Sequence, residues 1–176
     1  MRVSFCIPTH DGNARCQNYL FDIFHALSQQ TNKDFNVWIS DHSESNKVLD
    51  ACKEYADLFE INYMKNTKKY GNISANTNHA LQHADGDILK ILFSDDFILT
   101  CNLVAELDKA FTDDVHWAVT GYAHTVDDGH THYNPKIPYH NDKLLEGVNT
   151  LSSPSILALK RGIDMYFDED LTMLMD

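Results

Sequence analysis

Two adjacent carboxylates, Asp95 and Asp96, are the residues whose type and position most clearly suggest chemistry in this sequence. They directly follow an apolar run, Ile88 to Phe93, that predicts a buried strand. Carboxylate oxygens at the end of such a strand suit Mg²⁺ or Mn²⁺, hard cations that complete their coordination with water and substrate phosphates. The alternative is a turn in which one Asp caps the following helix. The dipeptide by itself leaves both interpretations open.

Strands and amphipathic helices alternate through the first hundred residues. The predicted strands are residues 2–8, 35–40, 60–65 and 88–93, and the predicted helices are residues 14–29, 48–59 and 73–84. Such alternation predicts βαβ units with right-handed crossovers, a mostly parallel sheet and helices on both faces. In open sheets of this kind, ligands bind beyond the carboxyl ends of the strands. The polar residues expected at that crevice are Thr9, His10, Asp41, Ser43, Asn78, Asp95 and Asp96.

Three segments resemble the family 2 glycosyltransferases, which have the GT-A fold. "VSFCIPTHDG" is similar to the first strand of that family and its Pro-Thr-Tyr-Asn loop, and "VWISDHSES" resembles its second strand with an Asp-Asp-Gly-Ser loop. "YGNISANTNHALQHADGDILKILFSDDFI" resembles the run that leads into the metal-binding DxD motif. Each motif alone is weak, but their order and spacing are specific. The resemblance covers residues 1–100 and implies a Rossmann-like, mostly parallel α/β sheet.

The resemblance implies a site for a nucleotide-diphospho-sugar, with a UDP-sugar favoured, and for Mn²⁺ or Mg²⁺. Asp41 matches the residue that contacts the base, and Asp95 matches a metal-binding carboxylate, with Asp96 as a further ligand. The remaining residues assigned to the nucleotide sugar are Pro8, Thr9, His10, Ser43, Asn78 and Ser94. Lys68 or Lys69 could also reach the diphosphate, although their segment is more typical of an exposed loop.

The sequence departs from the family pattern in ways that affect how the ribose and the metal are held. The departures are Ser40 and His42 in place of an Asp and a Gly, Thr77 where many members have Arg, and Phe93 or Ser94, depending on register, in place of the first Asp of the DxD motif. Asp96 could compensate for that missing carboxylate.

The catalytic base of the family is the Asp of an acidic pair at the start of a later helix. "YFDEDLTMLMD" resembles the segment that precedes this pair, which assigns the base to Asp176, with Met175 where Glu is common. The same segment predicts a helix that stops in mid-pattern. We therefore expect a C-terminally truncated chain, and the loss of this helix would cost activity even if nucleotide binding survives.

The later residues show a different pattern, with a predicted helix over 103–111, a hairpin over 116–133, a loop over 135–143 and a strand over 154–161. We expect one domain over residues 1–176, with a nucleotide-sugar and metal half, 1–100, and a partial acceptor half, 101–176. The hairpin also carries His124, His130 and His132, with Asp127 and Asp128 nearby. Such a set could hold a metal in a hydrolase, although a solvated turn is the simpler interpretation.

Composition excludes several classes of partner. The formal net charge of −12 argues against binding to nucleic acid or to anionic membranes. No apolar run approaches the ~18 residues of a membrane span, so we expect no transmembrane segment. The four cysteines contain no CxxC pair, and no signal peptide is visible, which favours a cytoplasmic location.

The favoured function is therefore a metal-assisted, inverting glycosyltransferase. Its acceptor is unknown, with a glycan, a lipid-linked glycan or a protein as the candidates. A noncatalytic nucleotide-sugar-binding module is the first alternative, because it needs no base. A sugar-nucleotide or nucleotidyl transferase is the second, but it would usually carry a glycine-rich, basic loop after the first strand. "PTHDGNARC" has one Gly and one Arg.

Overall fold

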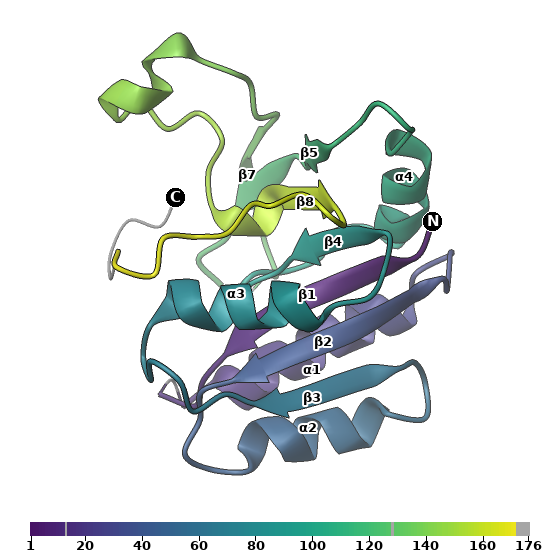
Figure 1. Ribbon diagram of the computed structural model, residues 1–176. Coiled ribbons are helices and arrows are strands. Elements are labelled where there is room, and N and C mark those ends of the chain that lie inside the picture. Colours follow the sequence, from purple (N-terminus) through teal and green to yellow (C-terminus); the bar gives the residue numbers. More distant parts are fainter. Residues whose placement is uncertain (13, 128, 172–176) are drawn as a thin grey trace.

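The described part of the chain folds around a six-stranded sheet (Figure 1). This computed structural model describes residues 1–12, 14–127 and 129–171. The strands of the sheet are β1 (Val3–Thr9), β2 (Phe35–Asp41), β3 (Ile61–Lys65), β4 (Ile88–Ile91), β5 (Trp117–Val119) and β8 (Leu157–Lys160). They lie in the order β3-β2-β1-β4-β8-β5, so the first strand of the chain lies inside the sheet.

The four strands from the first hundred residues run parallel. β1 pairs with β2 and with β4, and β2 pairs with β3, as the predicted βαβ units require. The register places Thr9 beside Asp41 at the carboxyl ends of β1 and β2. β8 pairs in the antiparallel direction with β4 and with β5. The predicted mostly parallel α/β architecture is therefore confirmed.

Helices cover both faces of the sheet, also as predicted. The helices α1 (Cys16–Ser28), α2 (Lys47–Tyr55) and α4 (Leu103–Ala110) pack on one face, and α3 (Ile73–His83) packs on the other (Figure 1). Successive strand side chains point to opposite faces, so Phe5 and Ile7 join the larger core while Cys6 joins the core under α3. Full burial of a large apolar side chain contributes about 1.5–3 kcal/mol to folding.

The second helix is shorter than its sequence pattern predicts. The pattern predicts a helix over 48–59, but α2 ends at Tyr55. Phe59 has helical spacing and yet lies beyond the helix, with its ring 6.0 Å from that of Phe24 and 5.4 Å from that of Phe35. The predicted helix end is wrong. The contacts of the Phe59 ring with Phe24 and Phe35 stabilise a turn after Tyr55 in place of a further helical turn.

The predicted hairpin over 116–133 divides between two sheets. β5 joins the main sheet, whereas β6 (Tyr122–His124) and β7 (Tyr133–Lys136) pair in a separate two-stranded sheet. Gly121 separates β5 from β6 at a close backbone contact, where a Cβ would lie 3.3 Å from the carbonyl oxygen of Lys136. A larger residue at this position would require the backbone of β7 at Lys136 to shift slightly.

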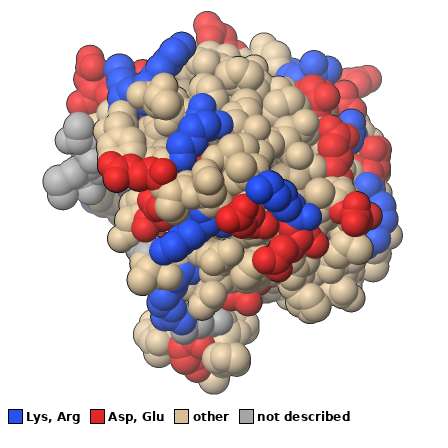
Figure 2. Space-filling model, turned by 90° about the horizontal axis from the view of Figure 1, so that it is seen from below, with Lys and Arg blue, Asp and Glu red and all other residues tan. Residues whose placement is uncertain are grey.

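Two short 3-10 helices complete the described elements, η1 (Asp142–Glu146) and η2 (Pro154–Ile156). The strand predicted over 154–161 begins only at Leu157, because Pro154 opens η2 and has no N–H to donate to a neighbouring strand. Among the described residues, the helices are too short or too polar to cross a membrane. Figure 2 shows acidic and basic side chains interspersed on the face seen from below.

A buried polar network joins α3 to the ends of β1 and β2. The amide nitrogen of Asn76 donates to the carbonyl oxygens of Thr9, at 3.2 Å, and Ser40, at 3.0 Å. Its amide oxygen accepts from the Ser40 hydroxyl, at 2.6 Å, and from the Asn66 amide, at 3.2 Å. One side chain therefore links two strands, a loop and a helix, and leaves none of its hydrogen-bonding groups unused.

We predict that Asn76→Ala destabilises the protein by about 2–4 kcal/mol, because it removes four buried hydrogen bonds from the network that joins α3 to the ends of β1 and β2. Urea denaturation measures the change. The matched control is Gln82→Ala, which removes an exposed amide from the same helix and should change stability by less than about 0.5 kcal/mol. Equal stability of the two variants would contradict the central role of Asn76.

Candidate functional site

The carboxylate of Asp41 lies at the edge of the sheet where β1, β2 and β3 end, and it accepts hydrogen bonds from β3 and from the loop after β2. This side chain is completely buried. One oxygen accepts from the Ser43 backbone N–H at 2.7 Å, and the other accepts from the Tyr63 hydroxyl at 2.6 Å and the Lys65 ammonium at 3.3 Å. Burial and the nearby Asp41 carboxylate raise the pKa of Tyr63. A carboxylate offers about four acceptor positions, so the three donors leave room for one more.

Two buried hydroxyl groups beside Asp41 have no hydrogen-bond partner within the described residues. They are the hydroxyls of Thr9, at the end of β1, and Ser43, in the loop after β2. Buried polar atoms are almost always paired, with protein, water or ligand. Since both hydroxyls lie at the edge where the parallel strands end, a ligand at this edge would supply the missing partners. The sequence predicted both residues as ligand contacts.

The two other predicted contacts on the first strand differ in exposure. Pro8 is buried and lies beside Ser40 in the β1–β2 register. His10 is exposed in the following loop, and its Nδ1 accepts from the Gly12 N–H at 3.0 Å. A Cβ at position 12 would lie 2.6 Å from the His10 ring, so a larger residue there would require the imidazole to move. The imidazole is thereby oriented by its own loop.

Several residues that shape this edge were missed by sequence reasoning. Asp11 accepts from the N–H groups of Glu44, at 3.3 Å, and Ser45, at 3.1 Å, and so joins the loops after β1 and β2. Contacts with Ser45 lower the pKa of the Asp11 carboxyl. Asn76 left no clear signal in the apolar periodicity, because the buried part of α3 around it also contains Ser74, Thr77 and Asn78.

His42 contributes a second link to the loop after β3. Its Nε2 lies 3.0 Å from the carbonyl oxygen of Lys68, and its ring lies 5.8 Å from that of Tyr70. Burial lowers the pKa of His42, which favours the neutral imidazole at physiological pH. The loop that carries Lys68 and Lys69 is therefore held against the end of β2. Lys69 itself pairs with Glu169, at 2.8 Å.

The carboxylates of Asp95 and Asp96 follow β4 in a tight turn. β4 ends at Ile91, earlier than predicted, and residues 94–95 form the turn, closed by the Asp96 N–H donating to the Phe93 carbonyl at 3.1 Å. The interpretation of either Asp as a helix cap is wrong, since the next helix, α4, has Asn102 at its N-cap. The pair thus lies free of the helix, at the same edge as Thr9 and Asp41.

The environments of the two carboxylates differ. Asp95 is exposed, and no hydrogen bond or ion pair to another described residue engages its carboxylate. Asp96 is largely buried, and its carboxylate accepts from the Ser153 hydroxyl at a long 3.5 Å. Burial raises the pKa of Asp96. A nearby cation would favour the ionised form of this weakly paired carboxylate.

These residues fit a hard divalent cation as an incomplete set of ligands. Asp95 and Asp96 offer oxygen donors, and Ser94 adds a half-exposed hydroxyl in the same turn. Mg²⁺ is commonly held by one or two carboxylates and completed by water and phosphate oxygens. Within the described residues, no group of three or more His, Cys, Asp or Glu side chains is placed to hold a metal. Such a cation would therefore depend on a ligand for the rest of its coordination.

The histidine hairpin does not assemble a metal cluster among the described residues, and Asp128 lies outside them. The ring of His124 packs 5.6 Å from that of Tyr122 and 5.8 Å from that of Tyr133. Asp127 accepts from the Thr131 hydroxyl at 2.6 Å, and these contacts lower its pKa to about 2. The hydrolase hypothesis therefore gains no support from the described part of the hairpin.

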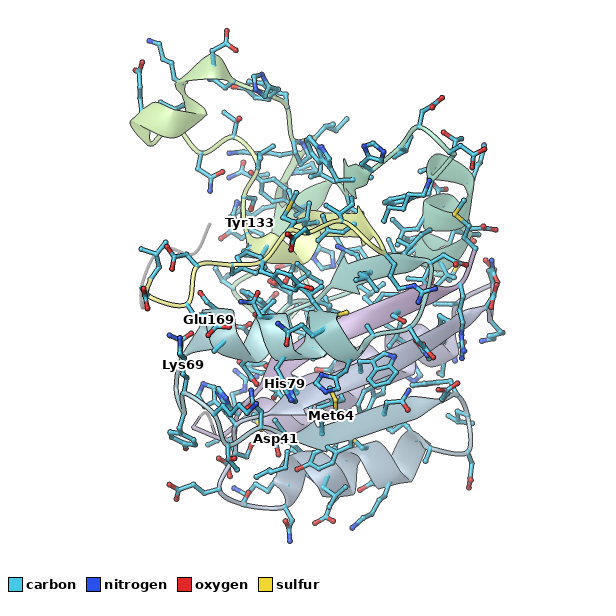
Figure 3. The ribbon with its side chains drawn as sticks, viewed as in Figure 1. Asp41, Met64, Lys69, His79, Tyr133 and Glu169 are labelled. Atoms are coloured by element: carbon cyan, nitrogen blue, oxygen red, sulfur yellow. The ribbon has the colours of Figure 1, made fainter. Side chains whose placement is uncertain are left out.

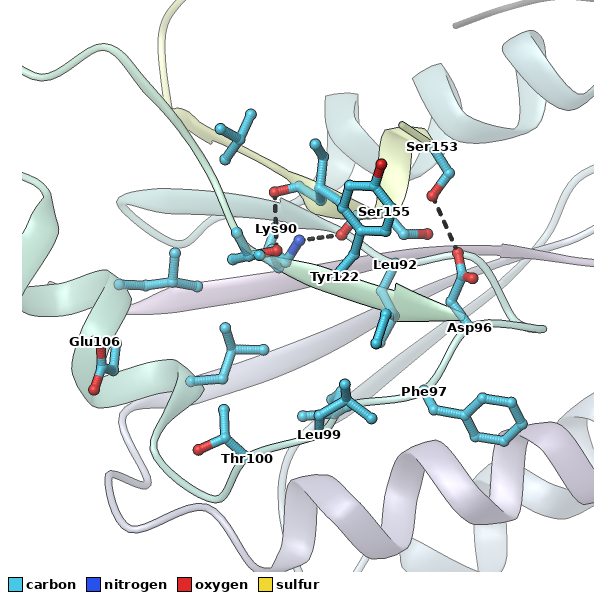
Figure 4. Close-up of a pocket in the computed structure, with 18 of the residues that line it drawn as sticks. Lys90, Leu92, Asp96, Phe97, Leu99, Thr100, Glu106, Tyr122, Ser153 and Ser155 are labelled. Carbon is cyan, nitrogen blue, oxygen red and sulfur yellow. Dashed lines mark hydrogen bonds between the residues drawn. The ribbon is translucent and has the colours of Figure 1, made fainter. Parts of the chain in front are cut away.

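A cavity of about 710 Å³ opens beside the Asp95–Asp96 turn, between the sheet, α4 and the β5–β6 segment (Figure 4). Much of its wall is apolar, with Leu92, Leu103 and Leu107 among the lining residues. Lys90 projects into it from β4 and is 2% exposed. The Lys90 ammonium donates to the Ser155 carbonyl oxygen.

The burial of the Lys90 side chain reduces the stability of the folded protein. Burial lowers the pKa of Lys90 to about 7, although the charge of Asp96 acts in the opposite direction. Only one of its three possible hydrogen bonds is made to a described residue. The ammonium form is therefore poorly compensated in this cavity.

Asn78, which was predicted to contact the nucleotide sugar, forms hydrogen bonds through its amide to the segment after β8. The amide oxygen accepts from the Phe167 N–H at 2.9 Å, and the amide nitrogen donates to the Phe167 carbonyl oxygen at 2.8 Å. The same nitrogen also lies 3.1 Å from a carboxylate oxygen of Glu169. The predicted base, Asp176, lies outside the described residues.

This chain matches the model of a known protein family, and its fold is similar to those of solved structures. The model of the family described as glycosyl transferase family 2 matches residues 4–166. Among curated proteins, none matches this chain. The structure of S. aureus TarS 1-349 in complex with UDP has a TM-score of 0.70 and 20% identity, covering 99% of this chain and 52% of that one. The structure of S. aureus TarS has a TM-score of 0.68 and 19% identity, covering 100% and 32%.

A mannosyltransferase from Pyrobaculum calidifontis, PcManGT, has also been solved in complex with GDP-Man and Mn²⁺. It has a TM-score of 0.53 and 20% identity, covering 66% of this chain and 34% of that one. The chain thus spans about half of TarS 1-349 and a smaller part of the other two. The predicted GT-A fold is confirmed by these structures together with the family match.

We predict that Lys90→Met stabilises the protein by about 1–4 kcal/mol at pH 7, because an apolar side chain replaces a poorly compensated buried charge. The lowered pKa means that the unfolded chain holds this proton between pH 7 and about 10.5 while the folded chain releases it. The stability of the unaltered protein therefore rises across that window, and its deficit relative to the variant shrinks. Denaturant unfolding at pH 7 and pH 9.5 measures both effects.

The control is Lys109→Met, which changes an exposed lysine on α4 and should alter stability by less than about 0.5 kcal/mol at either pH. A Lys90→Met variant less stable than the unaltered protein at pH 7 would contradict this account of the buried ammonium.

Proposed function

Because the chain belongs to glycosyl transferase family 2, we propose that it moves a sugar from a nucleoside-diphosphate donor to an acceptor hydroxyl. The observation that carries this proposal is the pair of buried, unpartnered hydroxyls of Thr9 and Ser43 at the edge where the parallel strands end. The bound UDP of TarS 1-349 and the bound GDP-Man of PcManGT support a donor of this class. A UDP-sugar is the favoured donor.

The donor's nucleoside occupies the ends of β1 and β2 in this proposal. Thr9 and Ser43 give it their free hydroxyls, and Asp41 uses its remaining acceptor position for a donor group of the base. Pro8 and His10 flank this position on the strand and loop of β1. The fixed carboxylate of Asp41 costs no reorganisation when the ligand binds, because Tyr63 and Lys65 already orient it.

The diphosphate lies at the end of β4, beside Ser94, Asp95 and Asp96. Asp95 is the primary ligand proposed for Mn²⁺ or Mg²⁺, and Asp96 is the second; the Mn²⁺ of PcManGT supports this part of the proposal. When bound, such a cation would stabilise the negative charge of the leaving diphosphate. A chain with a net charge of −12 has few other sources of positive charge for an anionic ligand.

The chemistry proposed is one in-line displacement at the anomeric carbon, which inverts its configuration. The acceptor oxygen forms the new glycosidic bond as the bond to the diphosphate breaks. Asp176 takes the acceptor's proton as general base. The rigid sheet edge holds donor and acceptor in attack geometry, and such positioning can lower a barrier by ~7 kcal/mol or more.

The proposed division of the chain follows from these roles. Residues 1–100 hold the donor and the metal, and residues 101–176 form part of the acceptor side, within a single domain. A glycan, a lipid-linked glycan and a protein are the candidate acceptors. Nucleic acid is not among them, because the net charge is strongly negative.

We expect the protein to bind UDP with an affinity that rises in the presence of Mn²⁺, and Asp95→Ala to lose at least about tenfold of that affinity because a metal ligand is removed. Isothermal calorimetry with and without Mn²⁺ measures the effect. Asp114→Ala is the control, since it removes an exposed carboxylate from the turn after α4. Failure of the unaltered protein to bind UDP, GDP or TDP would rule out the proposed function.

We further predict that Thr9→Val leaves the stability of the ligand-free protein unchanged or slightly raised, because the hydroxyl it removes has no partner to lose. The same change should weaken UDP binding by roughly tenfold, the value of one hydrogen bond. Thr112→Val, an exposed change of the same shape, should affect neither quantity. A marked loss of stability in Thr9→Val without weaker UDP binding would mean that this hydroxyl serves the fold alone.

A further inference from the structure

Two histidine side chains lie close together in the second half of α3. His79 and His83 are four residues apart, so they share one face of the helix. Their ring centroids are 4.5 Å apart, with an angle of 50° between the ring planes. His79 is half-buried and His83 is exposed. Both rings are therefore within reach of solvent and of each other.

The hydrogen bonds around α3 determine which ring nitrogen of His79 carries the proton. The Asn76 amide nitrogen donates to the carbonyl oxygens of Thr9 and Ser40, so its amide oxygen faces the Ser40 hydroxyl. That hydroxyl has a single proton, which it donates to the Asn76 amide oxygen at 2.6 Å. Its oxygen therefore accepts from the Nδ1–H of His79, at 2.8 Å. Neutral His79 consequently keeps a lone pair on Nε2.

A backbone carbonyl gives the same result for His83. Its Nδ1 lies 2.8 Å from the carbonyl oxygen of His79, and a carbonyl oxygen can only accept, so the proton of neutral His83 is also on Nδ1. Burial lowers the pKa of His79, which favours its neutral form. No hydrogen bond within the described residues uses the Nε2 atom of either ring. The helix face thus presents two unprotonated Nε2 atoms.

This arrangement matches the way in which proteins present imidazole to a metal ion. A metal-bound histidine donates its second ring N–H to an oxygen acceptor, which fixes the tautomer and the orientation of the ring. The Ser40 hydroxyl and the His79 carbonyl oxygen are such acceptors here. Histidines at positions i and i+4 also have the spacing of helical zinc ligands. An ion at the usual Zn–N distance of about 2.0–2.1 Å would contact both Nε2 atoms after a small rotation of the exposed His83 ring.

We propose that His79 and His83 form a nitrogen-based site for a borderline divalent transition-metal ion of the Zn²⁺ class. Imidazole nitrogen suits such ions, whereas Mn²⁺ and Mg²⁺ favour oxygen ligands such as those of Asp95 and Asp96. The two sites therefore select different metals. Water completes the coordination that two protein nitrogens leave open. This inference does not depend on the proposed transferase function.

Met64 of β3 borders the histidine pair. It is in register with Ser40, so its side chain points to the same face of the sheet as the hydroxyl that bonds to His79. Figure 3 shows Met64 and His79 beside each other on this face. Because Met and Leu have similar volumes, Met64→Leu alters the surroundings of the site while both imidazoles remain.

The chemistry of this site is binding rather than hydrolysis. In the helical zinc site of metalloproteases, the residue after the first histidine is the Glu that acts as general base, and here that residue is Ala80. A bound ion would instead join the last turn of α3 to the polar network of Ser40 and Asn76. Because the folded chain holds the two imidazoles together, Zn²⁺ should raise the urea concentration at the unfolding midpoint.

The experiment measures Zn²⁺ binding by calorimetry, with Zn²⁺ as the only added metal. His83→Ala should weaken Zn²⁺ binding at least about tenfold, because a ligand is lost, and it should abolish the Zn²⁺-dependent shift in the urea midpoint. The exposed position of His83 preserves the fold in this variant. The matched control is His25→Ala, which removes an exposed histidine from α1. Both His25→Ala and Met64→Leu should keep the Zn²⁺ affinity within about threefold of the unaltered value.

Nitrogen-15 NMR of the imidazole rings gives a second test that needs no variant. Without metal, both His79 and His83 should show the Nδ1–H tautomer, and added Zn²⁺ should shift the Nε2 signals of these two rings. An Nε2–H tautomer in either ring would contradict the arrangement on which the site depends.

The outcomes decide the inference separately from the proposed function. An unaltered protein that binds no Zn²⁺, or a His83→Ala variant that binds it equally well, would overturn the site. A tenfold loss in Met64→Leu would overturn its assignment to the two imidazoles alone. UDP binding in the presence of Mn²⁺ should be the same in His83→Ala and the unaltered protein, so a failure of UDP binding would defeat the proposed function and leave the histidine site standing.

Discussion

The amide of Asn76 is the contact on which the ligand-binding edge of this protein depends. Parallel strands expose backbone groups where they end, and these groups need partners if they are buried. Asn76 bonds to the carbonyl oxygens of Thr9 and Ser40 from a helix on one face of the sheet, and it also holds Asn66 in the next loop. This one side chain therefore adds to the backbone pairing of β1 and β2 in fixing the strand ends that carry Thr9 and Asp41.

Satisfied and unsatisfied polar groups divide the edge into a scaffold and a site. Asn76 and Asp41 are buried with their oxygens engaged, so they are rigid. The hydroxyls of Thr9 and Ser43 are buried without partners in the described chain, and Lys90 is a poorly compensated cation in a cavity. Unpaired buried groups cost stability. Two of the three unpaired buried side-chain atoms in the described chain, the Thr9 and Ser43 hydroxyls, lie at this edge, and the third is the indole nitrogen of Trp38 within β2.

Part of the fold and site could be predicted because local signals agreed with the tertiary structure. The alternating strands and helices of the first hundred residues, and the position of Asp95 and Asp96 after a buried strand, required only apolar periodicity and strand ends. The hairpin over 116–133 and the helix end near Phe59 could not be placed in this way. Their limits depend on the pairing of β5 with β8 and on the contact of Phe59 with Phe24, and both partners are distant in sequence.

The sequence by itself determined the class of the sheet, the family resemblance and the set of polar residues at the strand ends. Only the tertiary structure decided what each of those residues touches. Asn78 and Asp41 are both polar residues beside the predicted crevice, yet Asn78 bonds to the backbone of Phe167 and Asp41 bonds to Tyr63 and Lys65. Periodicity specifies which face of an element a residue occupies. The partner on that face comes from another part of the chain, so it is settled only when the chain has folded.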